Sequence, residues 1–316
     1  MLLSSIVVAS ALQNQKAHAP KVVATPPAEV DPLKLNLWRA GQATVEANNW
    51  YDLTSGKESS LDGFLKASDR YQFIFLGESH DDPVHHQIQA KVIDGLVKRG
   101  RNVTVGFEMF TRPNQPNINA WTLGKWSDDE FIENSNWKKE WGFPYPLYKP
   151  IFDVIKKNRL PMVALNVPRD WVRSVGKSGL KGLTADEQSQ IPTVRTDNAS
   201  HRVVFNAMMG GHPMQGSVGE NMYAAQCLWD EGMADTAIKY VTGRYGSAKA
   251  MPPHSVFVIV AGMGHGLYKQ GINWRIWKRT GMDTLTLINI EASGKESVSR
   301  GIADFTYVSP DFDRKQ

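Results

Sequence analysis

Residues 73–86, with the sequence FIFLGESHDDPVHH, decide the fold. The run Phe73-Ile74-Phe75-Leu76 is continuously apolar, which is typical of a strand buried on both faces in a parallel or mostly parallel sheet. Carboxylates and imidazoles follow it at once. In an open α/β sheet, ligands bind in the crevice at the carboxyl ends of the strands. The stretch therefore predicts both a fold class and the position of a site.

A helix is expected directly after this strand. Asp82 is suited to the N-cap and Pro83 to the first helical position, and apolar residues then recur at helical spacing to about Arg99. Gly100 is expected to end the helix. Residues 103–109, VTVGFEM, form the next predicted strand. Together these pieces make a right-handed βαβ unit.

Four further strands are predicted at residues 161–167, 256–261, 284–290 and 305–310, the last as an edge strand. Residues 168–246 are mainly helical in pattern. We therefore expect an α/β fold with a mostly parallel central sheet flanked by helices, and with a helical insertion at about 168–246.

The composition is that of an ordinary globular protein. The chain has 316 residues, is 41% hydrophobic and 22% charged, and carries a net charge of +4, which suits a single domain over residues 33–316. No dense Lys/Arg run with interleaved aromatic residues occurs, so nucleic acid is not an expected partner. The single cysteine, Cys227, excludes an intramolecular disulfide, a Cys-x-x-Cys redox motif and covalent haem attachment through Cys-x-x-Cys-His.

The N-terminus is expected to lie outside the folded domain. Residues 2–12 are apolar and Ala17-His18-Ala19 resembles a cleavage site, which predicts a signal peptide at 1–19, although no Lys or Arg precedes Lys16. A proline-rich linker follows at 20–32. We expect an exported protein, periplasmic or membrane-associated, without a transmembrane helix.

Polar residues at four strand ends are the candidate site. Glu78 and His80 follow the first strand, Glu108 ends the second, Asn166 ends the third, and His265 follows the strand at 256–261. Because parallel strands deliver their carboxyl ends to one edge of a sheet, we expect these side chains to converge.

Three more histidines are candidates for cofactor binding. His85 and His86 lie in the first turn of the predicted helix, whose N-terminus disfavours imidazolium; neutral imidazole suits metal ligation or a hydrogen bond to a carboxylate. A solvated helical turn is the alternative. His212 lies in the methionine-rich stretch 208–214, which either lines a ligand or fills the core.

Two common classes of enzyme are disfavoured. Residues 262–264 lack the third glycine of a dinucleotide-binding fingerprint. No G-x-S-x-G elbow is present, which argues against an α/β-hydrolase.

At these residues the sequence resembles the ChaN-like haem-binding uptake family. The resemblance spans about residues 61–290, and its matching pieces are 76–86, 106–109, 141–150, 164–169, 225–234 and 261–265. It implies an α/β fold, haem as cofactor, and a homodimer that holds haem between subunits with tyrosinate on the iron. Tyr145 and Tyr148 are the expected ligands, with Tyr268 and Tyr223 as rivals. The chain lacks the lipidation cysteine of the characterised lipoprotein.

The sequence is also similar to a wider superfamily that includes erythromycin esterases and Tiki-type metalloproteases. That similarity assigns Glu78, His80, Glu108 and His265 to a hydrolase. His80 or His265 would be the general base, and Glu108 would orient an imidazole or, with His80 and His265, hold a divalent metal. A binding protein whose site has lost its chemistry is the third hypothesis.

Overall fold

The structure is a computed structural model and describes residues 30–210, 216–246 and 249–312. The predicted signal peptide, most of the linker and His212 lie outside these residues. The strands are β1 (Gln42–Val45), β2 (Trp50–Asp52), β3 (Lys57–Ser59), β4 (Phe73–Glu78), β5 (Asn102–Thr111), β6 (Met162–Asn166), β7 (Ser255–Gly262), β8 (Thr284–Ala292), β9 (Glu296–Ser299) and β10 (Phe305–Pro310).

The α-helices are α1 (Leu61–Ser68), α2 (Pro83–Lys98), α3 (Gln115–Thr122), α4 (Asp128–Asn134), α5 (Trp137–Glu140), α6 (Tyr145–Asn158), α7 (Arg169–Ser178), α8 (Ala185–Ser189), α9 (Ala199–Met208), α10 (Gly216–Val241) and α11 (Ile272–Thr280). Short 3₁₀ turns are η2 (Arg112–Asn114), η3 (Leu180–Gly182), η4 (Met263–His265) and η5 (Leu267–Lys269). The described residues of the segment 168–246 are mainly helical, as predicted.

The central sheet has eight strands in the order β3-β2-β10-β8-β4-β7-β5-β6. The six strands from β10 to β6 run parallel, and β2 and β3 are antiparallel to their neighbours. The predicted α/β fold with a mostly parallel sheet is confirmed. The prediction that residues 305–310 form an edge strand is wrong, because the unpredicted β2–β3 hairpin pairs with β10 and covers that edge.

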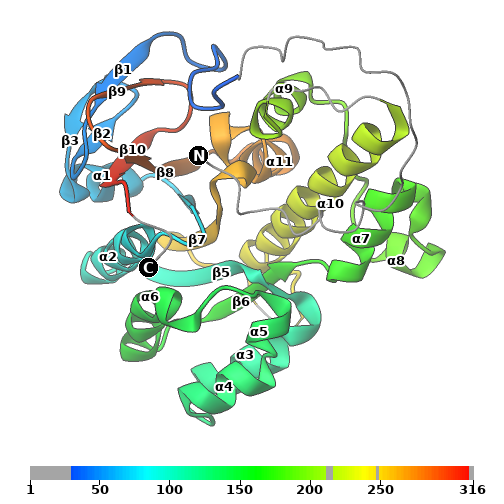
Figure 1. The fold of residues 1–316 in the computed structure, drawn as a ribbon. Coiled ribbons are helices and arrows are strands. Elements are labelled where there is room, and N and C mark those ends of the chain that lie inside the picture. Colours follow the sequence, from blue (N-terminus) through cyan, green and yellow to red (C-terminus); the bar gives the residue numbers. More distant parts are fainter. Residues whose placement is uncertain (1–29, 211–215, 247–248, 313–316) are drawn as a thin grey trace.

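The sheet is buried on both faces, because successive side chains of a strand point to opposite sides. In β4, Ile74 and Leu76 enter one core cluster and Phe73 and Phe75 the other. Helices α2 and α6 cover the first face, and α10 and α11 cover the second (Figure 1). This alternation explains the continuous apolar runs that identified the strands.

Helix α2 begins and ends where the sequence predicts. The Asp82 carboxylate accepts hydrogen bonds from the backbone N–H groups of Val84 (2.7 Å) and His85 (3.3 Å). Gly100, just past the helix, has a φ of +77°, a conformation that favours glycine. The cap fixes the start of α2 shortly after the end of β4, where the candidate site begins.

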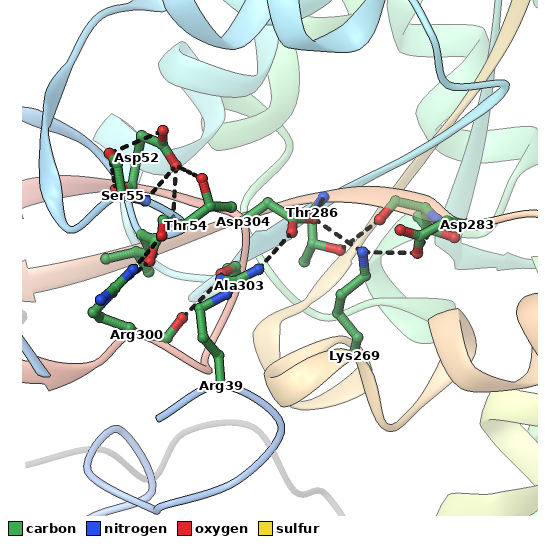
Figure 2. Close-up of polar contacts among 12 residues, drawn as sticks. Arg39, Asp52, Thr54, Ser55, Lys269, Asp283, Thr286, Arg300, Ala303 and Asp304 are labelled. Carbon is green, nitrogen blue, oxygen red and sulfur yellow. Dashed lines mark hydrogen bonds and ion pairs between the residues drawn. The ribbon is translucent and has the colours of Figure 1, made fainter. Parts of the chain in front are cut away.

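A buried charge network anchors the turn after His265. Lys269 lies between two carboxylates, Asp283 (2.8 Å) and Asp304 (3.1 Å), and Arg39 reaches Asp304 from the N-terminal segment (Figure 2). Asp304 also accepts the backbone N–H of Thr286, at 3.0 Å. The network ties η5, β8 and the segment before β10 together.

The turn itself needs this support. Tyr268 and Lys269 have φ values of +56° and +57°, and each such residue costs about 1–2 kcal/mol in the left-handed region. The Tyr268 hydroxyl accepts the backbone N–H of Leu35 at 2.9 Å. The chain that carries His265 is thereby held from two sides.

The two carboxylates that contact Lys269, those of Asp304 and Asp283, differ in burial, which allows a matched test. Asp304→Asn should lower the free energy of unfolding by about 3 kcal/mol, because it breaks a buried ion pair. Asp283→Asn should cost less than about 1 kcal/mol, since the Asp283 side chain is 56% exposed. Urea denaturation monitored by circular dichroism measures both. Equal costs would contradict the anchoring role of Asp304.

Candidate functional site

The first half of the site surrounds Glu78 at the end of β4. Its Oε1 atom lies 2.9 Å from Nδ1 of His80 and accepts a hydrogen bond from the Tyr148 hydroxyl at 2.8 Å. Its Oε2 atom lies 3.4 Å from Nε2 of His86, whose ring packs against Tyr148 with centroids 4.0 Å apart. One buried carboxylate therefore contacts two imidazoles and a phenol.

The second half is a chain of alternating charges. Glu108, near the end of β5, accepts the backbone N–H of Gly262 at 2.7 Å and lies 3.2 Å from Nε2 of His265. The other ring nitrogen of His265 lies 2.6 Å from Asp230 on α10 and 3.0 Å from the side-chain nitrogen of Gln226. Both nitrogens of this imidazole are therefore engaged by carboxylates.

Gly262, the last residue of β7, joins the two halves. A Cβ atom at this position would lie 3.0 Å from Nε2 of His80 and 3.6 Å from Oε2 of Glu108. The structure thus brings together Glu78, His80, Glu108 and His265 at the carboxyl ends of β4, β5 and β7. Within the part of the chain that the structure describes, Nε2 of His80 has no hydrogen-bond or ion-pair partner; the contact with Glu78 is made by Nδ1.

Pairing keeps these groups charged in spite of burial. Burial would raise the pKa of Glu108, but the His265 charge beside it lowers that pKa to about 2. Burial would lower the pKa of His265, but Glu108 and Asp230 raise it to about 10. The same balance holds the pKa of the Glu78 carboxyl well below its usual range, through His86 and His80. His265 is therefore an imidazolium at neutral pH, which argues against its predicted role as a general base.

Asp230 and Arg275 are site residues that the sequence analysis missed. Besides His265, the Asp230 carboxylate lies 3.0 Å from Nε2 of His201 and 3.3 Å from the Arg275 guanidinium. Gln226 and Asp230 are four residues apart on α10, a spacing that places both on one face of the helix. Polar residues at that spacing among apolar neighbours such as Ala225, Cys227 and Leu228 were the available signal.

An aromatic rim borders His80. The ring centroids of Trp141 and Phe143 lie 4.6 and 5.2 Å from that of His80. The Arg169 guanidinium lies 5.9 Å from the Trp141 ring. On the His265 side, the Trp229 ring centroid lies 6.0 Å from the imidazole.

Two other predicted residues have structural contacts. Asn166 donates to the backbone carbonyl of Glu108 at 3.0 Å and accepts from Val167 at 2.9 Å, so it ties β6 to β5. The ring of His85 accepts the Ser79 N–H at 3.0 Å, and its other nitrogen lies 3.0 Å from Asp82. His85 braces the loop after β4, whereas His86 faces Glu78.

All four candidate tyrosines are buried. Tyr148 donates to Glu78, and burial holds its pKa well above the usual range. Tyr145 stacks on Phe152 within the core, and its pKa is likewise raised by burial. Burial raises the pKa of Tyr268 to about 12. Tyr223 contacts His201, with 3.1 Å between the hydroxyl and Nδ1.

No three or more His, Cys, Asp or Glu residues within 30–210, 216–246 and 249–312 are grouped so that they could hold a metal ion. This includes the predicted set His80, Glu108 and His265. In the same ranges no helix is long and apolar enough to cross a membrane.

The comparisons with known proteins identify the family. The family model described as haem-binding uptake, Tiki superfamily, ChaN matches residues 64–276. This match spans more than half of the chain, and the protein belongs to that family. No curated protein matches the sequence.

The fold is shared with a solved structure of low sequence identity. A structure described as cofacial heme binding to ChaN of Campylobacter jejuni has a TM-score of 0.61 and 17% identity, over 82% of this chain and 95% of that chain. An erythromycin esterase mutant in its open conformation has a TM-score of 0.45 and 12% identity, over 81% and 83% of the two chains. The first similarity supports the fold, and the second is too low to add support.

The pairing of His265 predicts how stability depends on pH. Its stabilising contribution is complete below the ordinary histidine pKa of 6.5 and is lost as the pH rises towards about 10. The contribution of Glu108 is complete above its ordinary pKa of 4.5 and is lost as the pH falls towards about 2. As the pH rises from about 6.5 to 9, the loss of this contribution of His265 should therefore lower the free energy of unfolding by up to about 1.4 kcal/mol per pH unit.

Urea denaturation across this range tests that slope. The slope should be reduced in His265→Gln and retained in His254→Asn, which changes an exposed histidine before β7. An equal slope in all three proteins would mean that the His265 imidazolium is not the stabilising species.

Proposed function

We propose that this protein binds haem, with the iron held by Nε2 of His80 beside the aromatic rim of Trp141 and Phe143. Membership of the haem-binding uptake family supports haem as the ligand. The observation that carries the assignment to His80 is its one unengaged ring nitrogen. Both ring nitrogens of His265 face carboxylates. Nδ1 of His86 also lacks a hydrogen-bond partner, but His86 is 0% exposed whereas His80 is 7% exposed, so His80 is the ring that a ligand could reach.

The donor chemistry of His80 fits a metal-bound imidazole. Metal-ligating histidines almost always donate their second ring N–H to a carboxylate or carbonyl, which fixes the tautomer and increases the basicity of the ring. Glu78 occupies that position at 2.9 Å from Nδ1. The carboxylates of Glu78 and Glu108 favour a proton on His80. The same two carboxylates would favour a cation bound at Nε2 of His80.

Haem supplies an iron centre, a flat apolar macrocycle and two carboxylates. Trp141 and Phe143 would pack against the macrocycle, since large rigid aromatic side chains bury much area. Arg169, whose side chain is 32% exposed, would pair with a propionate. Tyr148 lies beside this rim, with its ring centroid 6.1 Å from that of Trp141, but its hydroxyl donates to Glu78, which argues against Tyr148 as a tyrosinate ligand.

Haemin titration followed by absorbance tests this proposal. The wild-type chain should give a saturable Soret shift, and His80→Ala should weaken binding by at least about tenfold, through loss of the iron ligand. The matched control is His254→Asn, which alters an exposed histidine. An unchanged titration in His80→Ala would refute the ligand. Loss of the shift in a Tyr→Phe variant at 145, 148, 223 or 268 would instead assign the iron to tyrosinate.

Hydrolysis is the second candidate function, and the Glu78–His80 pair favours it. A carboxylate-oriented imidazole with a free Nε2 is the arrangement of a general base towards water. His265, as an imidazolium held by Glu108 and Asp230, would stabilise developing negative charge.

A panel of esters and peptides, assayed with and without chelator, tests the hydrolase. His80→Ala should abolish turnover, and His265→Ala should lower it, while His254→Asn should leave it unchanged. Turnover that survives His80→Ala would exclude the proposed base.

We also infer export and a haem-linked homodimer, both supported by sequence resemblance. The apolar residues 2–12 and the Ala17-His18-Ala19 motif support a cleaved leader. The mass of the mature chain after expression reports cleavage, and size-exclusion chromatography with and without haemin reports dimer formation.

A further inference from the structure

A cavity of about 250 Å³ lies beside α10 and α11, the helices that cover the second face of the sheet, and shares no residue with the aromatic rim. It is lined by Pro192, Thr193, Arg195, Glu231, Trp274, Arg275, Lys278 and Arg279. These residues come from the segment before α9 and from α10 and α11, which lie side by side (Figure 1). Three arginines and a lysine thus meet one carboxylate around a single hollow.

The floor of the cavity is built from buried charges. Arg275 and Glu231 are 1% and 2% exposed, and their side chains lie 3.2 Å apart. Arg275 also donates to the backbone carbonyl of Arg195 at 3.3 Å, and Glu231 accepts the backbone N–H of Arg195 at 3.4 Å. The wall that carries Arg195 is therefore attached to both helices.

The cations around the cavity exceed the carboxylates that neutralise them. Glu231 is matched by Arg275. Arg279 contacts Asp235 at 2.6 Å, but Lys239 and Arg112 approach the same carboxylate at 2.7 and 3.5 Å. One negative charge therefore serves three positive ones.

The two remaining cations are weakly neutralised. Arg195 makes a bidentate contact with Asp197, at 3.2 and 2.7 Å. The Asp197 side chain is 63% exposed, so water and salt screen the charge of that carboxylate. Lys278 lies over the Trp277 ring, 5.9 Å from its centroid. The guanidinium of Arg195 lies 5.2 Å from the Trp274 ring, which holds that cation at the cavity.

We propose that this cavity binds a phosphate group carrying at least two negative charges, as in a phosphate monoester or diphosphate. Guanidinium groups donate paired hydrogen bonds that match phosphate oxygens. The excess of positive charge at the lining of the cavity favours a ligand with more than one negative charge. Trp277, which is 51% exposed beside Lys278, is suited to a membrane interface, so the phosphate belongs to a soluble metabolite or to a lipid headgroup.

Calorimetric titration with inorganic pyrophosphate at low ionic strength tests the proposal on the full chain. Binding should be saturable. The double variant Arg195→Gln/Lys278→Gln should weaken it by at least about tenfold, since two charge-assisted contacts are lost. Both side chains are partly or fully exposed, so the fold should persist, and circular dichroism verifies this.

The matched control is Lys98→Gln/Lys157→Gln. It removes the same two charges from the other face of the sheet, where both lysines contact Asp94. Its affinity for pyrophosphate should equal that of the wild type. No saturable binding, or equal weakening by the two double variants, would overturn the proposal, because the attraction would then be absent or due to net charge alone.

Sedimentation with phosphatidylglycerol vesicles distinguishes the two sources of phosphate. Vesicle binding that pyrophosphate displaces and that Arg195→Gln/Lys278→Gln removes would assign the site to a lipid headgroup. Pyrophosphate binding without vesicle binding would assign it to a soluble molecule. Vesicle binding that persists in the double variant, together with no pyrophosphate binding, would refute the site.

Discussion

The pairing of three buried carboxylates is the constraint on which this structure depends. Glu78, Glu108 and Asp230 come from β4, β5 and α10, and none is more than 8% exposed. An unpaired buried carboxylate costs several kcal/mol, so each must meet cations from other elements. His265 serves two of them at once and so ties the end of β5 to α10. The candidate site is therefore also a junction of the fold.

The part of the site that follows from strand order could be predicted from the sequence. The apolar runs before Glu78 and His265 and through Glu108 mark strands buried on both faces, and parallel strands deliver their ends to one edge. That reasoning needs no knowledge of packing. It identified the central sheet, helix α2 with its Asp82 cap, and the convergence of four polar side chains.

What could not be predicted depends on packing between elements far apart in the chain. Asp230 reaches His265 only because α10 packs against β6 and β7, which no local pattern encodes. Tyr145 and Tyr148 have the same side-chain chemistry in the sequence, yet one fills the core beside Phe152 and the other donates to Glu78. The short strands β2 and β3 have weak apolar patterns, so β10 was predicted to lie at an edge that they in fact cover.

The two central imidazoles illustrate how environment separates chemically identical groups. His265 has both nitrogens engaged by carboxylates and carries a fixed positive charge, so it organises the site. His80 is engaged at Nδ1 alone, and its Nε2 is the atom that we propose for iron or for a proton. Arg275 extends this arrangement outwards, because its guanidinium contacts Asp230 on one side and lines the basic cavity on the other. An anion bound there would draw on the same positive charge that balances Asp230. His265 and an anion in the cavity would then be connected through Asp230 and one buried side chain, Arg275.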